Sequence, residues 1–424
     1  MTEELLHHIW KFRLFHPQEL RTTTNERIHL LKVGEHNQDA GPDFFNAKIR
    51  IGDTIWAGNV EVHILSSDWN KHQHQENKSY DNIILHVVYK ADKQILRASG
   101  EPIPTLELKD RVATSYYRNY LHFKLSKDWI PCEKQVSEVP AIVLHATLDR
   151  LFVERLEAKA LLIQDLLRLS KMNWEETFYW MLARNFGFKT NALPFELLAK
   201  SLPLIVLAKH KSSLLQIEAL LFGQAGFLEQ HFNEKYPLQL QNEYAFLRQK
   251  FGLQPIEMHL WKFLRLRPVN FPTVRIAQFA ALIYHSSNMF SKVMDAGKLK
   301  ELENLMNVDV SLYWKEHYRF EKKSLFRNKK LGKEAINNMI INTIVPFLFV
   351  YGKAKGNESH MLRALQYMEE MDGEENTVIL KWKKLNIPAN SMSTTQALLQ
   401  LKNNYCDLRK CLHCPIGNYL LKKP

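Results

Sequence analysis

Two carboxylates and a histidine have a spacing that suits metal-dependent hydrolysis. Asp43 follows a Gly-Pro pair, and Glu61 comes eighteen residues later with His63 just beyond it. Alternate residues of a strand point to the same side, so Glu61 and His63 share a face if they lie on a strand. Two acidic side chains and a backbone carbonyl, such as that of Val62, can bind Mg²⁺ or Mn²⁺ for phosphodiester hydrolysis. We therefore interpret Asp43 and Glu61 as metal ligands and His63 as a catalytic residue that orients water or stabilises charge.

The surrounding pattern predicts elements that bring these residues together. A helix is expected over residues 3–14 and strands over residues 27–33, 46–51, 54–64 and 83–89, with a polar, histidine-rich segment over residues 66–81. Gly52-Asp53 fits a tight turn that places Ile51 opposite Thr54. Asp43 then lies near Glu61, and a bulge at Gly58 would shift the pairing by one residue.

These residues resemble the motif of the PD-(D/E)XK nuclease superfamily. Asp43 matches its aspartate and Glu61 its glutamate, while His63 stands where its lysine would be. The resemblance implies an αβββαβ, restriction-endonuclease-like domain over residues 1–130 that hydrolyses DNA or RNA. Glu4 would match the acidic residue that some members carry on the first helix.

The whole chain also resembles an uncharacterised bacterial family of unknown function. Gly-Pro-Asp-Phe-Phe at residues 41–45, Ser-Ser-Asp-Trp at residues 66–69 and the cysteine-rich C-terminal segment carry this resemblance. It implies no activity.

Three further histidines lie near the predicted site in sequence. We expect His72 to support it as a phosphate contact, and a His-x-His pair of His72 and His74 could also bind Zn²⁺ or Mn²⁺. His74 is otherwise interpreted as a solvated residue of a polar helix. His86 lies within an apolar strand and is interpreted as a core histidine that supports the site.

The four cysteines have a spacing typical of metal ligands. Cys406, Cys411 and Cys414 lie within nine residues, and either Cys132 or His413 could complete a four-ligand site. The occupant could be Zn²⁺ or a [4Fe–4S] cluster, and the alternative is a set of reduced thiols without a metal. Some PD-(D/E)XK nucleases are similar in holding such a cluster with one remote cysteine and three near the C-terminus.

Length and pattern predict an α+β protein of two domains. The first covers residues 1–130, and the second, an all-helical domain, covers residues 131–424. Helices are expected over residues 144–169, 174–186, 193–207, 214–232, 244–251, 274–290 and 335–350.

Composition bears on partners and location. The formal charge of +12 suits a polyanion, and we expect nucleic acid, DNA rather than RNA, with Arg265, Arg267 and Arg275 as phosphate contacts. The apolar segment 340–350 is too short to span a bilayer, so no membrane partner is expected. An acidic N-terminus without a secretory signal favours the cytoplasm.

The sequence therefore predicts a metal-dependent nuclease with a helical domain that positions nucleic acid. One alternative is a catalytically silent nucleic-acid-binding protein of the same fold. Another is a helical scaffold in which a bound metal contributes stability alone.

Overall fold

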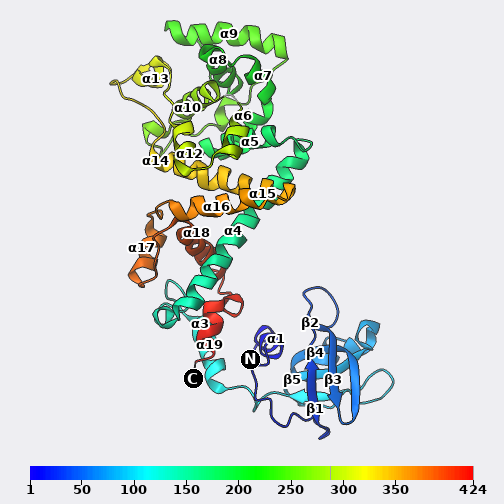
Figure 1. The fold of residues 1–424 in the computed structure, drawn as a ribbon. Helices are drawn as coiled ribbons and strands as arrows, with labels where there is room; N and C mark the ends of the chain where they lie inside the picture. Colours follow the sequence, from blue (N-terminus) through cyan, green and yellow to red (C-terminus); the bar gives the residue numbers. More distant parts are fainter. Residues whose placement is uncertain (287, 424) are drawn as a thin grey trace. The chain divides into compact units, whose positions relative to one another are not determined.

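A computed structural model describes residues 1–286 and 288–423, and the chain divides into two compact units (Figure 1). Unit 1 comprises Met1–Leu148, Lys381–Ile387 and Leu399–Pro424, and unit 2 comprises Asp149–Leu380 and Pro388–Leu398. The fold class is α+β, with an N-terminal mixed sheet and a largely helical remainder. The sequence analysis expected a single boundary near residue 130. The two units divide the chain differently, because the C-terminal segment packs with the N-terminal residues.

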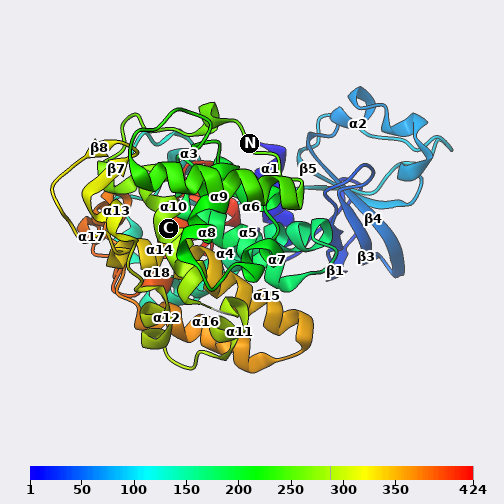
Figure 2. The same ribbon diagram turned by 90° about the horizontal axis from the view of Figure 1, so that it is seen from above.

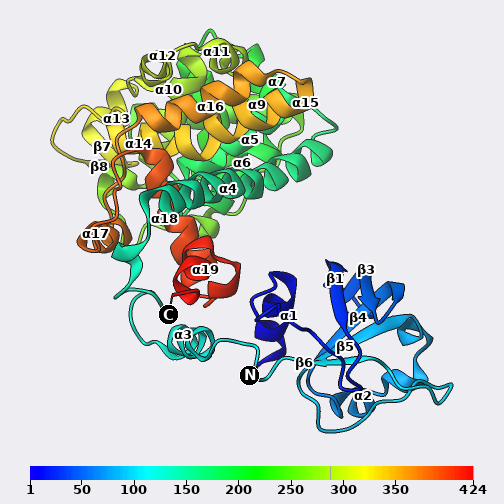
Figure 3. The same ribbon diagram turned by 60° about the horizontal axis from the view of Figure 1, so that its bottom comes forward.

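Unit 1 begins with a helix and a mixed sheet (Figure 3). Its elements are α1 (Glu3–Lys11), β1 (Ile28–Lys32), β2 (Glu35–His36), β3 (Phe44–Ile51), β4 (Thr54–Leu65), α2 (Asp68–Lys71), η1 (His74–Glu76), η2 (Lys78–Tyr80), β5 (Ile83–Lys90) and β6 (Thr105–Glu107). The strand order is β1-β3-β4-β5-β6, and β2 pairs with β3. β1, β3 and β4 are antiparallel, whereas β5 is parallel to both β4 and β6.

Helix α1 starts where the sequence predicts. The Thr2 hydroxyl accepts a hydrogen bond from the Leu5 N–H at 3.3 Å, which satisfies one of the free donors of the first turn. The apolar side of the helix is fully buried. Both α1 and α2 pack against β4, so the middle of this strand is covered.

A bulge in β3 sets which residues face one another across the hairpin. Ile51 pairs with Thr54, as the Gly52-Asp53 turn predicts. The register shifts between Phe44 and Ala47, so that Phe44 pairs with Val60. Asn46, inside this interval, has a left-handed φ of 54°. The shift therefore arises at Asn46 and not at Gly58, and it brings the residue before Phe44 beside Glu61.

Gly58 is required for a different reason. A Cβ at this position would lie 2.5 Å from Ile84 Cγ2 and 2.7 Å from the Asn82 carbonyl oxygen. The close approach of the chain after η2 to β4 therefore leaves room only for glycine.

The rest of unit 1 joins residues from both ends of the chain. It contains α3 (Thr114–Leu125), η3 (Val136–Glu138), η7 (Lys402–Cys406), η8 (Cys411–His413) and α19 (Pro415–Leu421). Both α19 and η8 pack against α3 (Figure 1). The Asn119 amide donates to the carbonyl oxygens of Leu421, at 3.4 Å, and Lys423, at 2.9 Å. Hydrogen bonds between segments about 300 residues apart thus fix the C-terminal segment.

Unit 2 is built almost entirely of helices, among which α8, α9 and α10 lie side by side (Figure 2). Between α4, which begins in unit 1, and α18, which ends there, the elements are α4 (Ala141–Leu169), α5 (Trp174–Phe186), α6 (Ala192–Ser201), α7 (Leu204–Lys209), α8 (Leu214–Gln224), α9 (Lys235–Phe251), η4 (Met258–Leu260), η5 (Pro268–Asn270), α10 (Pro272–His285), α11 (Met289–Asp295), α12 (Leu299–Met306), α13 (Leu312–Glu316), β7 (His317–Arg319), β8 (Lys322–Lys323), α14 (Lys333–Met339), η6 (Ile340–Ile344), α15 (Val345–Lys355), α16 (Glu358–Glu370), α17 (Thr377–Lys384) and α18 (Met392–Leu401). The helix expected over residues 193–207 is two helices, because Pro203 cannot continue the first.

The apolar segment near residue 340 belongs to a longer helix than expected. Lys333–Lys355, which comprises α14, the π-helical turn η6 and α15, is long and apolar enough to cross a membrane. However, 78% of its most apolar window is buried inside the fold. Such burial is typical of a core helix.

Candidate metal centre

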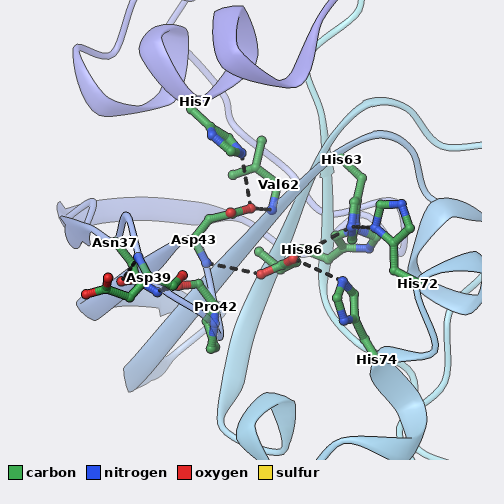
Figure 4. Close-up of polar contacts among 11 residues, drawn as sticks. His7, Asn37, Asp39, Pro42, Asp43, Val62, His63, His72, His74 and His86 are labelled. Carbon is green, nitrogen blue, oxygen red and sulfur yellow. Dashed lines mark hydrogen bonds and ion pairs between the residues drawn. The ribbon is translucent and has the colours of Figure 1, made fainter.

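A short loop fixes Asp43 at the start of β3. The Asn37 side-chain amide donates to three carbonyl oxygens of the loop, those of Asp39, Ala40 and Pro42, at 3.0–3.3 Å (Figure 4). The Asn37 N–H also donates to the Asp43 carbonyl oxygen at 2.8 Å. These bonds hold the loop in one conformation, so Asp43 enters the strand at a defined place.

Asp43 and Glu61 are joined through backbone groups. The Asp43 N–H donates to Glu61 Oε2 at 3.2 Å, and the Val62 N–H donates to Asp43 Oδ2 at 3.0 Å. The structure therefore brings these two carboxylates together, at the β3–β4 junction that the turn register predicts. Glu61 is only 4% exposed, so its second oxygen faces other protein groups and not bulk water.

A histidine of α1 lies on the other side of Asp43. His7 Nε2 is 3.1 Å from Asp43 Oδ2 (Figure 4). Burial lowers the pKa of His7, but the hydrogen bond and negative charge of Asp43 outweigh burial and raise it. Sequence reasoning missed His7 and named Glu4 on this helix. Glu4 is exposed, and it is His7 that faces the carboxylates.

His63 is held between two other imidazoles. Its Nδ1 lies 2.8 Å from His86 Nε2, and its Nε2 lies 3.2 Å from His72 Nδ1. His63 Nε2 is also 3.6 Å from Glu61 Oε1. Both ring nitrogens are therefore engaged, which differs from the expected role of a free base that orients water.

His74, interpreted from sequence either as part of a metal-binding His-x-His pair or as a solvated residue, completes the group. Its Nε2 lies 3.2 Å from Glu61 Oε1, and its ring stacks on Tyr80 with a centroid separation of 3.9 Å. The ligand nitrogens of His63, His72 and His74 all lie within 4.8 Å of one another. We call these three histidines, with Glu61, the histidine–glutamate cluster.

Burial keeps the inner imidazoles neutral. It lowers the pKa of His63 to about 2, with the neighbouring His86, His74 and His72 adding to the effect. Burial likewise lowers the pKa of His86 to about 3, with His74 adding to it. Burial and the charge of Asp43 raise the pKa of Glu61, against a lowering by His74. Neutral imidazole is the form that binds a metal ion, so burial holds His63 in the protonation state of a ligand.

The donor atoms fit a divalent transition metal. Imidazole nitrogens are better ligands for Zn²⁺, Fe²⁺ or Cu²⁺ than for Mn²⁺. All four ions bind imidazole better than Mg²⁺ does, because Mg²⁺ prefers oxygen ligands. Metal-binding histidines usually donate their second ring nitrogen to a fixed partner, and His86 is such a partner for His63. The arrangement can therefore hold a metal ion beside a buried carboxylate.

All four cysteines surround one small cavity in unit 1. The cavity, of about 20 Å³, is lined by Cys132, Cys406, Cys411 and Cys414. Burial raises the pKa of Cys132, Cys406 and Cys411, and the neighbouring thiols raise it further. His413, the other residue considered as fourth ligand, is exposed and does not line the cavity.

The arginines expected to contact phosphate differ in exposure. Arg265 and Arg267 are exposed ahead of η5. Arg275 is 6% exposed, and its guanidinium donates to Gln278 Oε1 at 3.0 Å and Asn270 Oδ1 at 2.6 Å. It also lies over the Phe188 ring. Arg275 thus lacks the exposed guanidinium that a phosphate contact requires, because it braces the start of α10.

Fold and site define an α+β protein with a histidine- and carboxylate-rich centre in its N-terminal unit. The chain belongs to the family described as protein of unknown function DUF2851, whose model matches residues 3–377. That range includes the histidine–glutamate cluster and Cys132, and it ends before the other three cysteines. Comparison with the curated proteins and with the solved structures found no match.

Proposed function

We propose that unit 1 is a metal-dependent phosphodiester hydrolase that acts on nucleic acid, with DNA as the first candidate substrate. The observation that carries the proposal is the convergence of His63, His72 and His74 next to Glu61 Oε1. A hydrolytic metal ion polarises a phosphate oxygen and lowers the pKa of a bound water.

The ligand set refines the expectation of Mg²⁺ or Mn²⁺. Three imidazoles beside one carboxylate oxygen favour Mn²⁺ over Mg²⁺, since Mg²⁺ takes oxygen ligands and retains its waters. His63, His72, His74 and Glu61 would hold the ion. Asp43, which the sequence analysis also named as a ligand, is bound through Oδ2 to the Val62 N–H and to His7, so we assign it to positioning Glu61.

The element order agrees with a nuclease. Apart from the two-residue strand β2, a helix, an antiparallel meander of β1, β3 and β4, a short helical crossover and the parallel strand β5 resemble the αβββαβ order that the PD-(D/E)XK resemblance implies. In that resemblance, Asp43 and Glu61 match the two acidic residues of the motif. The formal charge of +12 would attract a polyanionic substrate.

The surroundings of His7 favour its charged form. Its raised pKa means that its imidazole carries a proton at higher pH than a free histidine does, against Asp43 Oδ2. A protonated imidazole at this place can stabilise negative charge on a phosphate. His86 has a different part, because it fixes the ring of His63 through Nδ1.

The test is cleavage of DNA and RNA substrates by the purified full-length protein with Mn²⁺ or Mg²⁺. We expect cleavage with Mn²⁺ that Glu61→Gln abolishes, since the substitution removes the buried charge and keeps the shape. Glu35→Gln is the matched control, because Glu35 is an exposed glutamate of the same sheet. It should retain full activity.

Cleavage that persists in Glu61→Gln would exclude this centre. Salt-sensitive binding of nucleic acid without cleavage, under every metal tried, would favour the catalytically silent alternative. A protein that neither binds nor cleaves nucleic acid would instead fit the scaffold alternative.

A further inference from the structure

The four cysteines converge although they come from separate parts of the chain. Cys132 lies between α3 and η3, and Cys406 ends η7. Cys411 begins η8, and Cys414 directly follows it. About 270 residues separate the first from the others, and most of these residues form unit 2. Convergence of all four on one cavity therefore needs a physical reason.

The local backbone around the cavity is tightly folded. The Cys414 N–H donates to the Cys411 carbonyl oxygen at 3.3 Å, which folds the two cysteines into a tight turn. Gly417 is packed against this turn, and a Cβ there would lie 2.3 Å from the Cys411 carbonyl oxygen. Any other residue at position 417 would therefore displace the turn that carries Cys411.

Buried thiols without a metal gain little from one another. The four are not joined by disulfides. Each is only a weak hydrogen-bond donor. A bound cation would give all four a common partner, because thiolates are the ligands of soft metals.

We propose that Cys132, Cys406, Cys411 and Cys414 hold one metal ion through four thiolates, with Zn²⁺ as the first candidate. A cavity of about 20 Å³ has room for a single water-sized species, which suits one ion. Lys410, which also lines the cavity, supplies a positive charge beside a site with an excess of thiolates.

The metal ion would fasten the C-terminal segment to the base of unit 1. Cys406, Cys411 and Cys414 belong to the segment that packs on α3, and Arg409 donates to the Phe123 carbonyl oxygen of α3 at 3.3 Å. α3 in turn contacts the start of α1, since the Thr2 and Tyr120 hydroxyls lie 3.2 Å apart. Loss of the ion should therefore loosen residues 399–424 first.

The experiment measures the metal content of the purified full-length protein by mass spectrometry of the elements. We expect about one zinc per chain at this site. Because the histidine–glutamate cluster could also take up zinc, the measurement is made on His72→Gln, in which that cluster is incomplete. Adding Cys132→Ser to this variant should lower the remaining metal at least tenfold, whereas adding His413→Ala should leave it unchanged.

A second measurement does not depend on the folding of a variant. In the native wild-type protein the four thiols should resist a thiol reagent until a strong chelator removes the ion, and then all four should react. Four thiols that react at once, or metal retained in Cys132→Ser, would overturn the proposal. Iron and acid-labile sulfide with a visible absorption band would overturn the single-ion assignment in favour of a cluster. Nuclease activity plays no part in either readout.

Discussion

Burial determines the chemistry of the histidine–glutamate cluster at the scale of single residues. His63 and His86 are almost fully buried and face each other through ring nitrogens. A charged imidazole would be costly here, so the pKa of both falls far below the usual value. His72 differs, since it is exposed and reaches the group from the end of α2. It is therefore the member that can be removed with least effect on folding.

We expect His72→Gln to weaken Mn²⁺ binding by at least about 10-fold. Loss of a residue that only hydrogen-bonds to a metal ligand already lowers metal affinity by about that factor. Isothermal titration calorimetry of the wild type and the variant would measure the change. Its thermal stability without metal should match the wild type, because His72 is exposed. His29→Gln replaces another exposed histidine of unit 1 and should bind Mn²⁺ normally. Equal affinities in wild type and His72→Gln would exclude His72 as a ligand.

At the scale of elements, the bulge at Asn46 determines which residue faces Glu61. With the uninterrupted register set by the turn, Phe44 would pair with Glu61, whereas the bulge pairs it with Val60. The left-handed conformation of Asn46 absorbs the extra residue. Asparagine tolerates this conformation, but β-branched residues do not.

Asn46→Val should therefore destabilise the protein by about 1–2 kcal/mol, the usual cost of a left-handed conformation in a residue with a Cβ branch. Asn46→Gly should be neutral or nearly so. Lys48→Val places the same side chain at an exposed position of the same strand with ordinary geometry, and it should be tolerated. Urea denaturation would give the three free energies of unfolding. A neutral Asn46→Val would mean that the bulge is not held by this residue.

The sequence predicted the hairpin better than the rest of the site. Alternation and the Gly52-Asp53 turn carry enough information to place Asp43 near Glu61. His7 was missed, and the choice between a metal-binding and a solvated His74 stayed open, because periodicity says which face of an element is buried and not which element covers it. His74 also follows Gln73, whose left-handed φ changes the direction of the chain. The short helical segment that begins at His74 has too few residues to show a hydrophobic period.

A buried glutamate in α8 gives unit 2 a dependence on pH. Burial raises the pKa of Glu218 to about 7 in the folded chain, above the unfolded value of 4.5. Because the pKa is higher in the folded chain, the contribution of Glu218 to the free energy of unfolding is greatest below about pH 4.5 and is lost as pH rises through 7. Relative to the wild type, Glu218→Gln should gain about 2–3 kcal/mol between pH 5 and pH 8.

Thermal or urea denaturation of both proteins at the two pH values would measure this gain. The difference between variants cancels the titration of other groups. Glu229→Gln, an exposed glutamate of the same unit, should show no such gain. A pH-independent difference between wild type and Glu218→Gln would contradict the raised pKa.

At the scale of the whole molecule, unit 1 is discontinuous in sequence. It draws residues 1–148 from one end of the chain and residues 381–387 and 399–424 from towards the other. The sequence analysis placed a single boundary near residue 130 because the hydrophobic pattern becomes helical soon after it. Such a pattern reports what a segment forms locally, whereas the return of α19 to α3 depends on contacts that no local pattern contains.

A fragment of residues 149–398 should consequently unfold cooperatively on its own, since it contains all of unit 2. A fragment of residues 1–148 should be unstable alone and gain order when a peptide of residues 399–424 is added. Circular dichroism and amide hydrogen exchange would follow both fragments. A stable fragment 1–148 that ignores the peptide would show that the C-terminal segment is dispensable for unit 1.

The return of residues 399–424 to unit 1 also determines when unit 1 can complete its folding during synthesis. About 250 residues are translated between Leu148 and Leu399, which takes roughly 10 to 50 s at ordinary rates of elongation. During this interval α3 has left the ribosome but lacks α19, the helix that covers it, while unit 2 is already able to fold. The surface of α3 that α19 covers can therefore be buried only after residues 399–424 have been translated. Until then this surface is exposed to other nascent chains.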